Sequence, residues 1–290
     1  MRTRLQIGWS PAAPTPLDAD VDARIAALRT MLSGARVAAL TGAGISTDSG
    51  IPDYRSPGAP ARTPMTAQMF TSSAEFRRHY WARNHLGWRH MDAARPNAGH
   101  RALTELQRRG RLTGVITQNV DMLHTKAATQ RVIELHGCYG RVRCLGCRAV
   151  ISRRALADVL EALNPGFADR VAGRGAIEVA PDADATLTET ADFVVADCPR
   201  CGGILKPDIV YFGENAPKDV VEQSFSLIDE SDALLVAGSS LTVMSGLRFA
   251  RHATRTGKPL IIVNRGATRA DDIADLKIDH LIATVLPALL

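Results

Sequence analysis

The sequence of 290 residues contains no hydrophobic run close to the roughly 18 residues that a membrane-spanning helix requires. Its N-terminus carries Arg2 and Arg4 but lacks the apolar stretch of a secretory signal. These absences favour a cytoplasmic protein that has no membrane partner. A short organellar presequence is the alternative, because both arginines and Ser10 precede the first acidic residue, Asp18.

The sequence also lacks a cluster of basic residues of the kind that forms a nucleic-acid-binding arm. Its net charge of +5 is spread along the chain, so we expect no nucleic-acid partner and only a weak preference for anionic ligands such as a dinucleotide. With 46% hydrophobic and 22% charged residues, the composition is that of a soluble globular protein. The length favours one large domain with a smaller one inserted into it.

Cysteine is scarce, and four of the five cysteines are arranged as two Cys-x-x-Cys pairs. In a reducing compartment such pairs are more typical of metal ligands than of disulfides. Four thiolates suit the tetrahedral geometry of a closed structural Zn²⁺ site, which we expect at Cys144, Cys147, Cys198 and Cys201. Four buried free thiols are the alternative. The fifth, Cys138, is predicted to be a small buried residue and not a ligand.

Short apolar runs alternate with helical patterns along most of the chain. The runs are typical of buried strands and occupy residues 36–40, 112–117, 232–237 and 259–264. Amphipathic spacing predicts helices over residues 17–32, 97–109, 216–230 and 241–255. The alternation predicts βαβ units and a mostly parallel sheet, in which ligands bind at the carboxyl ends of the strands.

The first predicted strand runs into a glycine-rich turn, Thr41-Gly42-Ala43-Gly44-Ile45-Ser46. Glycines in such a turn let backbone N–H groups approach a pyrophosphate, as in a dinucleotide-binding turn. Thr47 replaces the third glycine of the usual G-x-G-x-x-G, and no acidic residue ends a second strand about 20 residues later. An ordinary dehydrogenase site is therefore not expected, and a plain tight turn is the alternative.

A much longer motif begins at this turn and runs from Gly42 to Arg55 as GAGISTDSGIPDYR. Four further motifs follow it, namely TQNVD at 117–121, LHG at 135–137, KPDIVYFGE at 206–214 and GSSL at 238–241. Together they resemble the sirtuin (Sir2-like) family of deacylases over residues 20–286. The segments at 80–84 and 117–126 are similar to the class II branch, which includes the vertebrate mitochondrial member with lipoamidase, deacylase and ADP-ribosyl transfer activities. Tyr54 departs from the family's usual phenylalanine but keeps an aromatic ring.

The resemblance implies a Rossmann-like parallel-sheet α/β domain that carries an inserted helical segment and a small zinc-binding module. The NAD-binding domain would comprise residues 18–137 and 207–290, with the helical segment at 56–95. The zinc module would occupy residues 138–206, part of which is predicted as a long loop rich in glycine, alanine and aspartate. Residues 1–17, rich in proline and small residues, are predicted to form a flexible arm.

The resemblance further implies an NAD-dependent protein-lysine deacylase. In that reaction the acyl oxygen attacks C1′ of the ribose as nicotinamide departs, and the products are free lysine, nicotinamide and O-acyl-ADP-ribose. His136 is the implied general base, because an imidazole with an ordinary pKa of about 6.5 accepts a proton at neutral pH. Asn119 is the second implied catalytic residue. Protein mono-ADP-ribosyl transfer at the same site and a non-catalytic NAD-binding module are the alternatives.

The implied NAD site is assembled from residues that follow several predicted strands. Asp121 would orient the carboxamide, and Gln118 and Asn119 the ribose, since amide and carboxylate groups suit these partners. A capped strand-to-helix turn is the alternative for this segment. The residues expected to contact NAD are Gly42, Ala43, Gly44, Ser46, Asp53, Tyr54, Arg55, Gln118, Asn119, Val120, Asp121, Gly238, Ser239, Ser240, Asn264, Arg265, Gly266 and Ile282.

The resemblance also implies that a substrate peptide adds as a strand between Gly238–Leu241 and an extended segment formed by Val210, Tyr211, Phe212 and Gly213. Tyr80 and Arg83 lie three residues apart in a predicted helix and so share one face. A similar pair binds acidic acyl groups in the desuccinylase branch, although an ordinary packed helix face is the preferred interpretation here. His124 is interpreted as a packing or surface residue.

Overall fold

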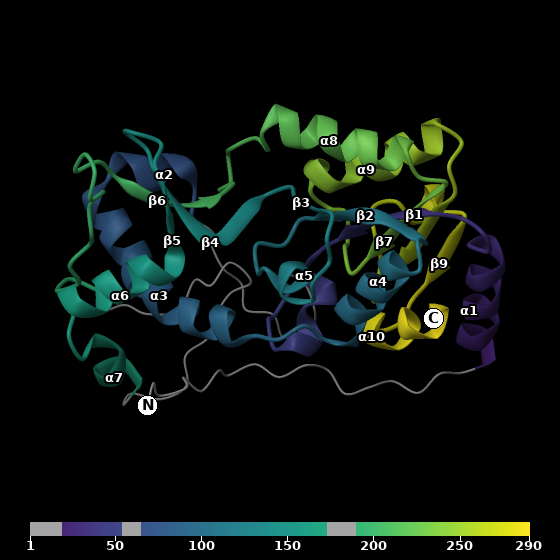
Figure 1. The fold of residues 1–290 in the computed structure, drawn as a ribbon, viewed down its shortest axis with the longest axis horizontal. Helices are drawn as coiled ribbons and strands as arrows, with labels where there is room; N and C mark the ends of the chain where they lie inside the picture. Colours follow the sequence, from purple (N-terminus) through teal and green to yellow (C-terminus); the bar gives the residue numbers. More distant parts are fainter. Residues whose placement is uncertain (1–18, 54–64, 173–189) are drawn as a thin grey trace.

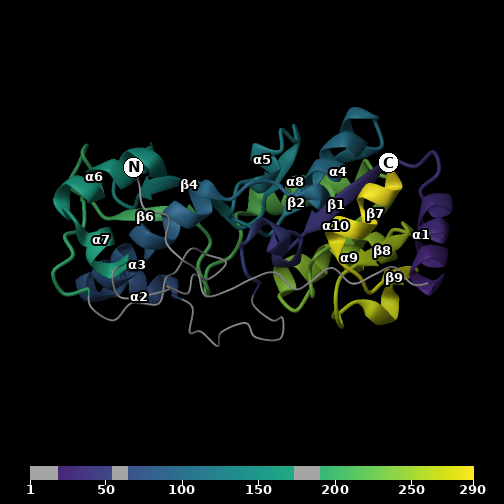
Figure 2. The ribbon, with the colours of Figure 1, turned by 90° about the horizontal axis from the view of Figure 1, so that it is seen from below.

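The computed structural model describes residues 19–53, 65–172 and 190–290. It shows two lobes side by side, a larger lobe built on a parallel sheet and a smaller lobe of helices around a short antiparallel sheet (Figures 1 and 2). The predicted arm at 1–17, residues 56–64 of the predicted helical segment and residues 173–189 of the predicted loop lie outside the described residues. No helix among the described residues is long and apolar enough to cross a membrane.

Six parallel strands form the sheet of the larger lobe in the order β3-β2-β1-β7-β8-β9. Their bounds are β1 Val37–Thr41, β2 Leu112–Thr117, β3 Val132–Glu134, β7 Ala233–Ala237, β8 Leu260–Val263 and β9 Leu276–Ile278. Every residue of β1, β7 and β8 is buried, which is why these strands appear as nearly continuous hydrophobic runs in the sequence. Numbered within the sheet, the order is 3-2-1-4-5-6, the doubly wound order of Rossmann folds, which confirms the predicted fold class. The order reverses between β1 and β7, where such folds bind ligands.

Helices cover both faces of this sheet (Figure 1). The helices α1 (Ala19–Met31), α4 (Ala98–Arg108) and α10 (Ile282–Val285) share one buried core with the sheet, and α8 (Lys218–Asp229) and α9 (Met244–Arg255) share the core on the other side. The helix predicted from residue 241 begins three residues later, because Leu241 adopts a left-handed conformation with a φ of 54°. A helix cannot pass through that conformation.

The helical segment and the zinc module fold together into the smaller lobe. Its elements are α2 Ala67–Ser72, α3 Ala74–Ala93, β4 Gly137–Cys144, β5 Val150–Ser152, α6 Arg153–Leu163, α7 Phe167–Ala172 and β6 Leu205–Ile209. One core of buried side chains joins these elements, and Arg153 of α6 is fully buried with its guanidinium 5.4 Å and 5.0 Å from the ring centroids of Trp81 and Trp88. The boundary predicted between residues 206 and 207 falls inside β6, which pairs with β4.

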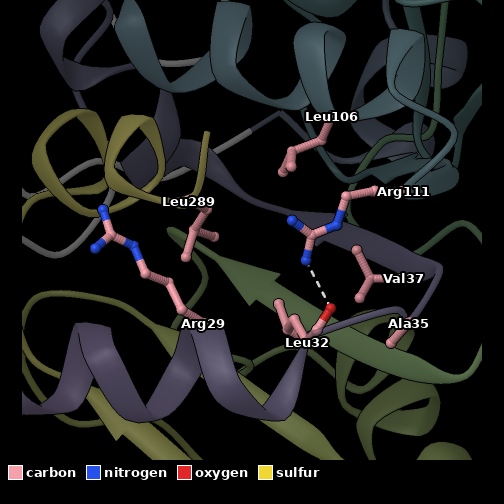
Figure 3. Close-up of a pocket in the computed structure, with 7 residues that line it drawn as sticks. All are labelled: Arg29, Leu32, Ala35, Val37, Leu106, Arg111 and Leu289. Atoms are coloured by element: carbon pink, nitrogen blue, oxygen red, sulfur yellow. Dashed lines mark hydrogen bonds between the residues drawn. The ribbon is translucent and has the colours of Figure 1, made fainter.

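A small cavity lies at the opposite end of the larger lobe from the smaller one, among α1, the end of α4 and the 3₁₀ turn Pro287–Leu289 (Figure 3). Its space of about 20 Å³ holds roughly one water molecule. Arg111 and Arg29 line it, and each donates to a backbone carbonyl, of Leu32 and Ala288 respectively. The cavity is therefore a gap in the packing and not a substrate site.

Candidate functional site

Two glycine turns meet where the strand order reverses. The turn after β1 donates a hydrogen bond from the Gly44 N–H to the carbonyl of Gly238, 2.8 Å away, in the turn after β7. A Cβ atom added to Gly42 would lie 2.8 Å from the Gly238 carbonyl oxygen, and one added to Gly238 would lie 2.3 Å from the Ile45 nitrogen. Both turns thus approach each other through bare backbone. The glycines therefore serve the packing of one turn on the other, at the edge of the sheet where doubly wound folds bind dinucleotides.

The substitution Gly238→Ala should destabilise the larger lobe by about 2–5 kcal/mol. The residue has a φ of +69°, which costs a side-chain-bearing residue roughly 1–2 kcal/mol, and the clash with Ile45 adds about 1–3 kcal/mol. Gly110→Ala is the matched control, because Gly110 has a φ of +70° and no atom within 4 Å of the new Cβ. In urea unfolding, the free energy of unfolding should therefore fall about twice as far for Gly238→Ala as for Gly110→Ala. Equal losses would contradict the close approach.

A polar cluster lies directly beneath the first turn. Asp121 is only 3% exposed and accepts hydrogen bonds from the Ser46 hydroxyl (2.6 Å) and the Leu123 N–H (2.9 Å). Burial raises the pKa of this carboxyl, and the bond from Ser46 opposes that rise. Asn119 donates from Nδ2 to the Gly42 carbonyl at 2.9 Å and to the Ser46 hydroxyl at 3.1 Å. The cluster fixes the turn and leaves the Asn119 amide oxygen without a hydrogen bond to any described residue.

His136 lies in the link between β3 and β4. Its Nδ1 lies 2.9 Å from the Gln118 carbonyl, which can only accept, so Nδ1 carries the proton of the neutral ring. The other nitrogen, Nε2, is then the basic atom and lies 2.9 Å from the Ser245 hydroxyl. Burial lowers the pKa of His136, so the ring is neutral at pH 7 and able to accept a proton. Sequence analysis did not identify Ser245.

Of the remaining residues predicted to bind NAD, some lie at the carboxyl ends of the strands and others do not. Gln118 donates to the Ser239 hydroxyl at 2.9 Å, which connects the ends of β2 and β7, and Asn264 follows β8 and donates to the Arg265 and Gly266 carbonyls. Ile282 is buried in the core of the larger lobe. Tyr54 and Arg55 lie outside the described residues. Ala43 begins the 3₁₀ turn Ala43–Ile45 after β1, and Asp53, Val120 and Ser240 lie in loops.

The four cysteines of the predicted zinc site come together in the smaller lobe. Their sulfur atoms all lie within 4.8 Å of one another, with 3.5 Å between Cys144 and Cys201 and 3.7 Å between Cys147 and Cys198. Tetrahedral Zn²⁺ with bonds of about 2.3 Å requires sulfur separations of about 3.8 Å, so the cluster fits this ion. Cys138 is buried outside the cluster, and burial raises its pKa to about 11.

The segment predicted to bind a peptide forms strand-like hydrogen bonds as far as Phe212. β6 ends at Ile209, the Val210 N–H donates to the His136 carbonyl at 2.9 Å, and Phe212 forms a parallel bridge with Thr66. Gly213 then turns the chain with a φ of 89°. Phe212 is 48% exposed, whereas Tyr211 is buried. The segment thus connects the catalytic-base candidate to an exposed aromatic ring.

Tyr80 packs inside the smaller lobe. It is 1% exposed, its hydroxyl lies 2.9 Å from the Tyr139 hydroxyl, and its ring makes edge contacts with Phe70 and Tyr211. Arg83 is partly buried one turn later on α3. The contacts of Tyr80 support a packed helix face.

A pair of buried histidines lies below the first glycine turn. The sequence analysis interpreted His124 as a packing or surface residue and did not identify His100. His124, in the short helix α5 (Leu123–Lys126), bonds the Thr41 hydroxyl through Nε2 at 2.9 Å, and its ring centroid lies 4.8 Å from that of His100. It is buried and not a surface residue. Burial lowers the pKa of His124 to about 4 and that of His100 well below its ordinary value of 6.5.

This pair should make the protein sensitive to acid. A histidine held neutral by folding contributes stability that is fully present above pH 6.5 and is lost as the pH falls toward 4, because the unfolded chain binds the proton first. For His124 alone the loss should approach about 3 kcal/mol. Urea unfolding measured between these pH values should show a free energy of unfolding that falls as the pH falls. The variant His124→Gln should show a smaller fall. A slope unchanged in that variant would contradict the assignment.

Comparisons with known proteins agree with one another. The sequence model of the Sir2 family matches residues 42–245. The NAD-dependent protein deacetylase 1 of Mycobacterium avium is 63% identical over 252 residues, covering 87% of this chain and 89% of that protein. The mitochondrial NAD-dependent protein lipoamidase sirtuin-4 of Bos taurus is 46% identical over 259 residues, covering 87% and 81%. A solved Sir2 complex with a p53 peptide and NAD+ is similar with a TM-score of 0.72 and 32% identity, covering 90% of this chain and 94% of that one.

Proposed function

The chain belongs to the Sir2 family and is an NAD-dependent protein deacylase, and from that premise we propose which residues bind, orient and react. It uses NAD and carries a structural zinc ion, which the four-cysteine cluster is arranged to bind. Its substrates are acyl-lysine proteins, in line with neighbours bound to a p53 peptide and to a propionylated peptide. The observation that carries the proposal is a neutral His136 with a basic Nε2 at the edge where the two glycine turns meet.

We propose that the paired glycine turns hold the diphosphate and that the ends of β2 and β8 hold the two riboses. Gly44 and Gly238 let the two turns pack directly against each other. The buried Asp121 fixes the Ser46 hydroxyl, to which Asn119 donates in turn. Asp121 accepts bonds from the Ser46 hydroxyl and the Leu123 N–H and so fixes the turn. Each carboxylate oxygen has a further lone pair, so the carboxamide contact expected from the sequence stays part of the proposal.

The reaction depends on one proton transfer by the protein. When bound, NAD supplies a ribose carbon that loses nicotinamide in favour of the acyl oxygen. His136 accepts the proton of a ribose hydroxyl at Nε2, while Nδ1–H keeps its bond to the Gln118 carbonyl. Asn119 orients the ribose through its amide oxygen. One water molecule is consumed, and free lysine, nicotinamide and O-acyl-ADP-ribose are the products.

An assay with an acetyl-lysine peptide and isotopically labelled NAD tests this function. Mass spectrometry should detect O-acetyl-ADP-ribose and free nicotinamide in equal amounts with the deacetylated peptide. Labelled ADP-ribose attached to protein, without release of acyl groups, would instead support mono-ADP-ribosyl transfer. No feature of the described residues favours that alternative.

We propose that Tyr80 and Arg83 serve packing and do not select acidic acyl groups. Tyr80 is enclosed by aromatic rings, with its hydroxyl engaged by Tyr139. Acetyl-lysine peptides should therefore be processed at least as fast as succinyl or glutaryl peptides, and Arg83→Met should leave their rate ratio unchanged. Faster turnover of acidic peptides that Arg83→Met abolishes would show that the pair binds a carboxylate, as a guanidinium can.

We further propose a cytoplasmic protein that acts without nucleic-acid or membrane partners. The zinc cluster needs four thiolates, which a reducing compartment maintains. Several arginines are paired with carboxylates, such as Arg131 with Glu230 and Arg143 with Asp208, and so do not form a basic surface. Imaging of the tagged protein in its host and binding to DNA-cellulose and anionic vesicles test these points.

A further inference from the structure

Ser245 is the second hydrogen-bonding partner of the His136 ring. It lies in the first turn of α9, and its hydroxyl is 2.9 Å from Nε2, while Nδ1 is 2.9 Å from the Gln118 carbonyl. Since Nδ1 carries the proton, Nε2 can only accept, so the Ser245 hydroxyl donates in the resting enzyme. The side chain therefore binds the same lone pair that accepts the substrate proton in the proposed reaction.

The start of α9 is fixed at this place by close packing. A Cβ added to Gly246 would lie only 2.6 Å from Oε1 of Gln118, so α9 and the Gln118 side chain touch through bare backbone. Gln118 in turn donates to Ser239 at 2.9 Å. Gln118, which bonds Nδ1, and α9, whose Ser245 bonds Nε2, are thus packed against each other. The imidazole of His136 is therefore held at both nitrogens.

From this geometry we propose that Ser245 is a positioning residue for His136 that changes from donor to acceptor during each turnover. This inference rests on the proposed role of His136 as the base. When the ribose hydroxyl gives its proton to Nε2, the electron pair of its O–H bond stays on the oxygen, which then bonds to the acyl carbon. The π pair of the bond between that carbon and the lysine nitrogen moves to the nitrogen. The new Nε2–H then needs an acceptor once that oxygen has reacted. The Ser245 oxygen, which keeps its own proton throughout, supplies it.

The charges around His136 make such an acceptor useful. Arg248 lies one turn further along α9 and disfavours a positive charge on the ring, as does the positive N-terminal end of α9 itself. The Gln118 carbonyl, at the end of β2, offsets this effect. A second acceptor at Nε2 stabilises the imidazolium, and a hydrogen bond to a charged group is worth more than one to a neutral group.

The first test needs no turnover. In ligand-free protein with ¹⁵N-labelled histidine, the Nε2 resonance of His136, assigned by its absence in His136→Ala, should be that of an unprotonated, hydrogen-bonded nitrogen. In Ser245→Ala it should move downfield as the bond is lost, and Ser245→Thr should restore it. Ser226→Ala is the matched control, because Ser226 is an exposed helical serine that bonds only its own helix. An unchanged resonance in Ser245→Ala would overturn the proposal.

The second test separates the two stages of the reaction. Ser245→Ala should exchange labelled nicotinamide into NAD at a rate within about twofold of the parent enzyme but transfer the acyl group about 10-fold more slowly, since a hydrogen bond to a charged group is lost. Ser245→Thr should recover most of that rate. Equal slowing of both stages, or none, would overturn the role of Ser245. Failure of the underlying assignment is distinguishable, because His136→Ala itself would then deacylate normally.

Discussion

Replacing His136 with alanine should lower the rate of deacylation by about 10²–10⁴-fold, the usual contribution of a general base. The imidazole is held by Gln118 and Ser245, and the diphosphate is assigned to the glycine turns and not to this ring. Affinity for NAD, measured by calorimetry, should therefore change little. The loss should appear in the turnover number and not in the binding constant.

The matched control is His252→Ala. His252 lies on α9 and pairs with Asp229 through Nε2, at the far end of the helix from Ser245. This variant should deacylate at the parent rate. If folded His136→Ala also turned over at close to the parent rate, the base would have to be another residue.

Cys198→Ser should remove the zinc ion and with it the fold of the smaller lobe. Structural zinc contributes on the order of 10 kcal/mol of binding free energy in small domains, which is comparable to the whole stability of a typical domain. Cys198 and Cys144 are also part of the buried core that joins α3, α6 and the antiparallel sheet. We therefore expect a metal-poor chain with weakened near-ultraviolet circular dichroism and low solubility. Elemental analysis of the parent protein should give one zinc ion per chain.

Cys138→Ala provides the control for this experiment. Cys138 is buried near the same sheet but outside the cluster, so its loss should leave the zinc content at one per chain. A Cys198→Ser variant that keeps its zinc, or that loses zinc and unfolds at the same urea concentration as the parent, would show that the cluster is not a structural metal site.

The ends of the strands were predictable because local chemistry marks them. Buried parallel strands require continuous apolar residues, and glycine or a short polar residue stops each run, as Gly42, Gln118, Gly238 and Asn264 do. The zinc site was predictable for a similar reason, since two Cys-x-x-Cys pairs have few other uses. The structure confirms the fold class and the meeting of the four sulfur atoms. The placement in the class II branch stays a prediction.

Other features depend on contacts between distant segments. The sequence does not reveal that α3 and the zinc module share one core, because Trp81 and Arg153 are 72 positions apart and each alone is an ordinary helical residue. β3 and β9 have three residues each, too few for a periodic pattern. Ser245 was missed because its direction depends on α9 beginning at Met244, which the left-handed Leu241 determines.

The wide separation of the two cysteine pairs has a consequence for biosynthesis. Cys198 follows Cys147 by 51 residues, and Cys201 follows Cys144 by 57. At a synthesis rate of about 5–20 residues per second, the first pair emerges about 3–10 seconds before the second. During that interval Cys144 and Cys147 are an incomplete site, open to oxidation into a disulfide. An oxidant present during translation should therefore trap the nascent chain, whereas the same oxidant added after zinc has bound should leave the protein folded.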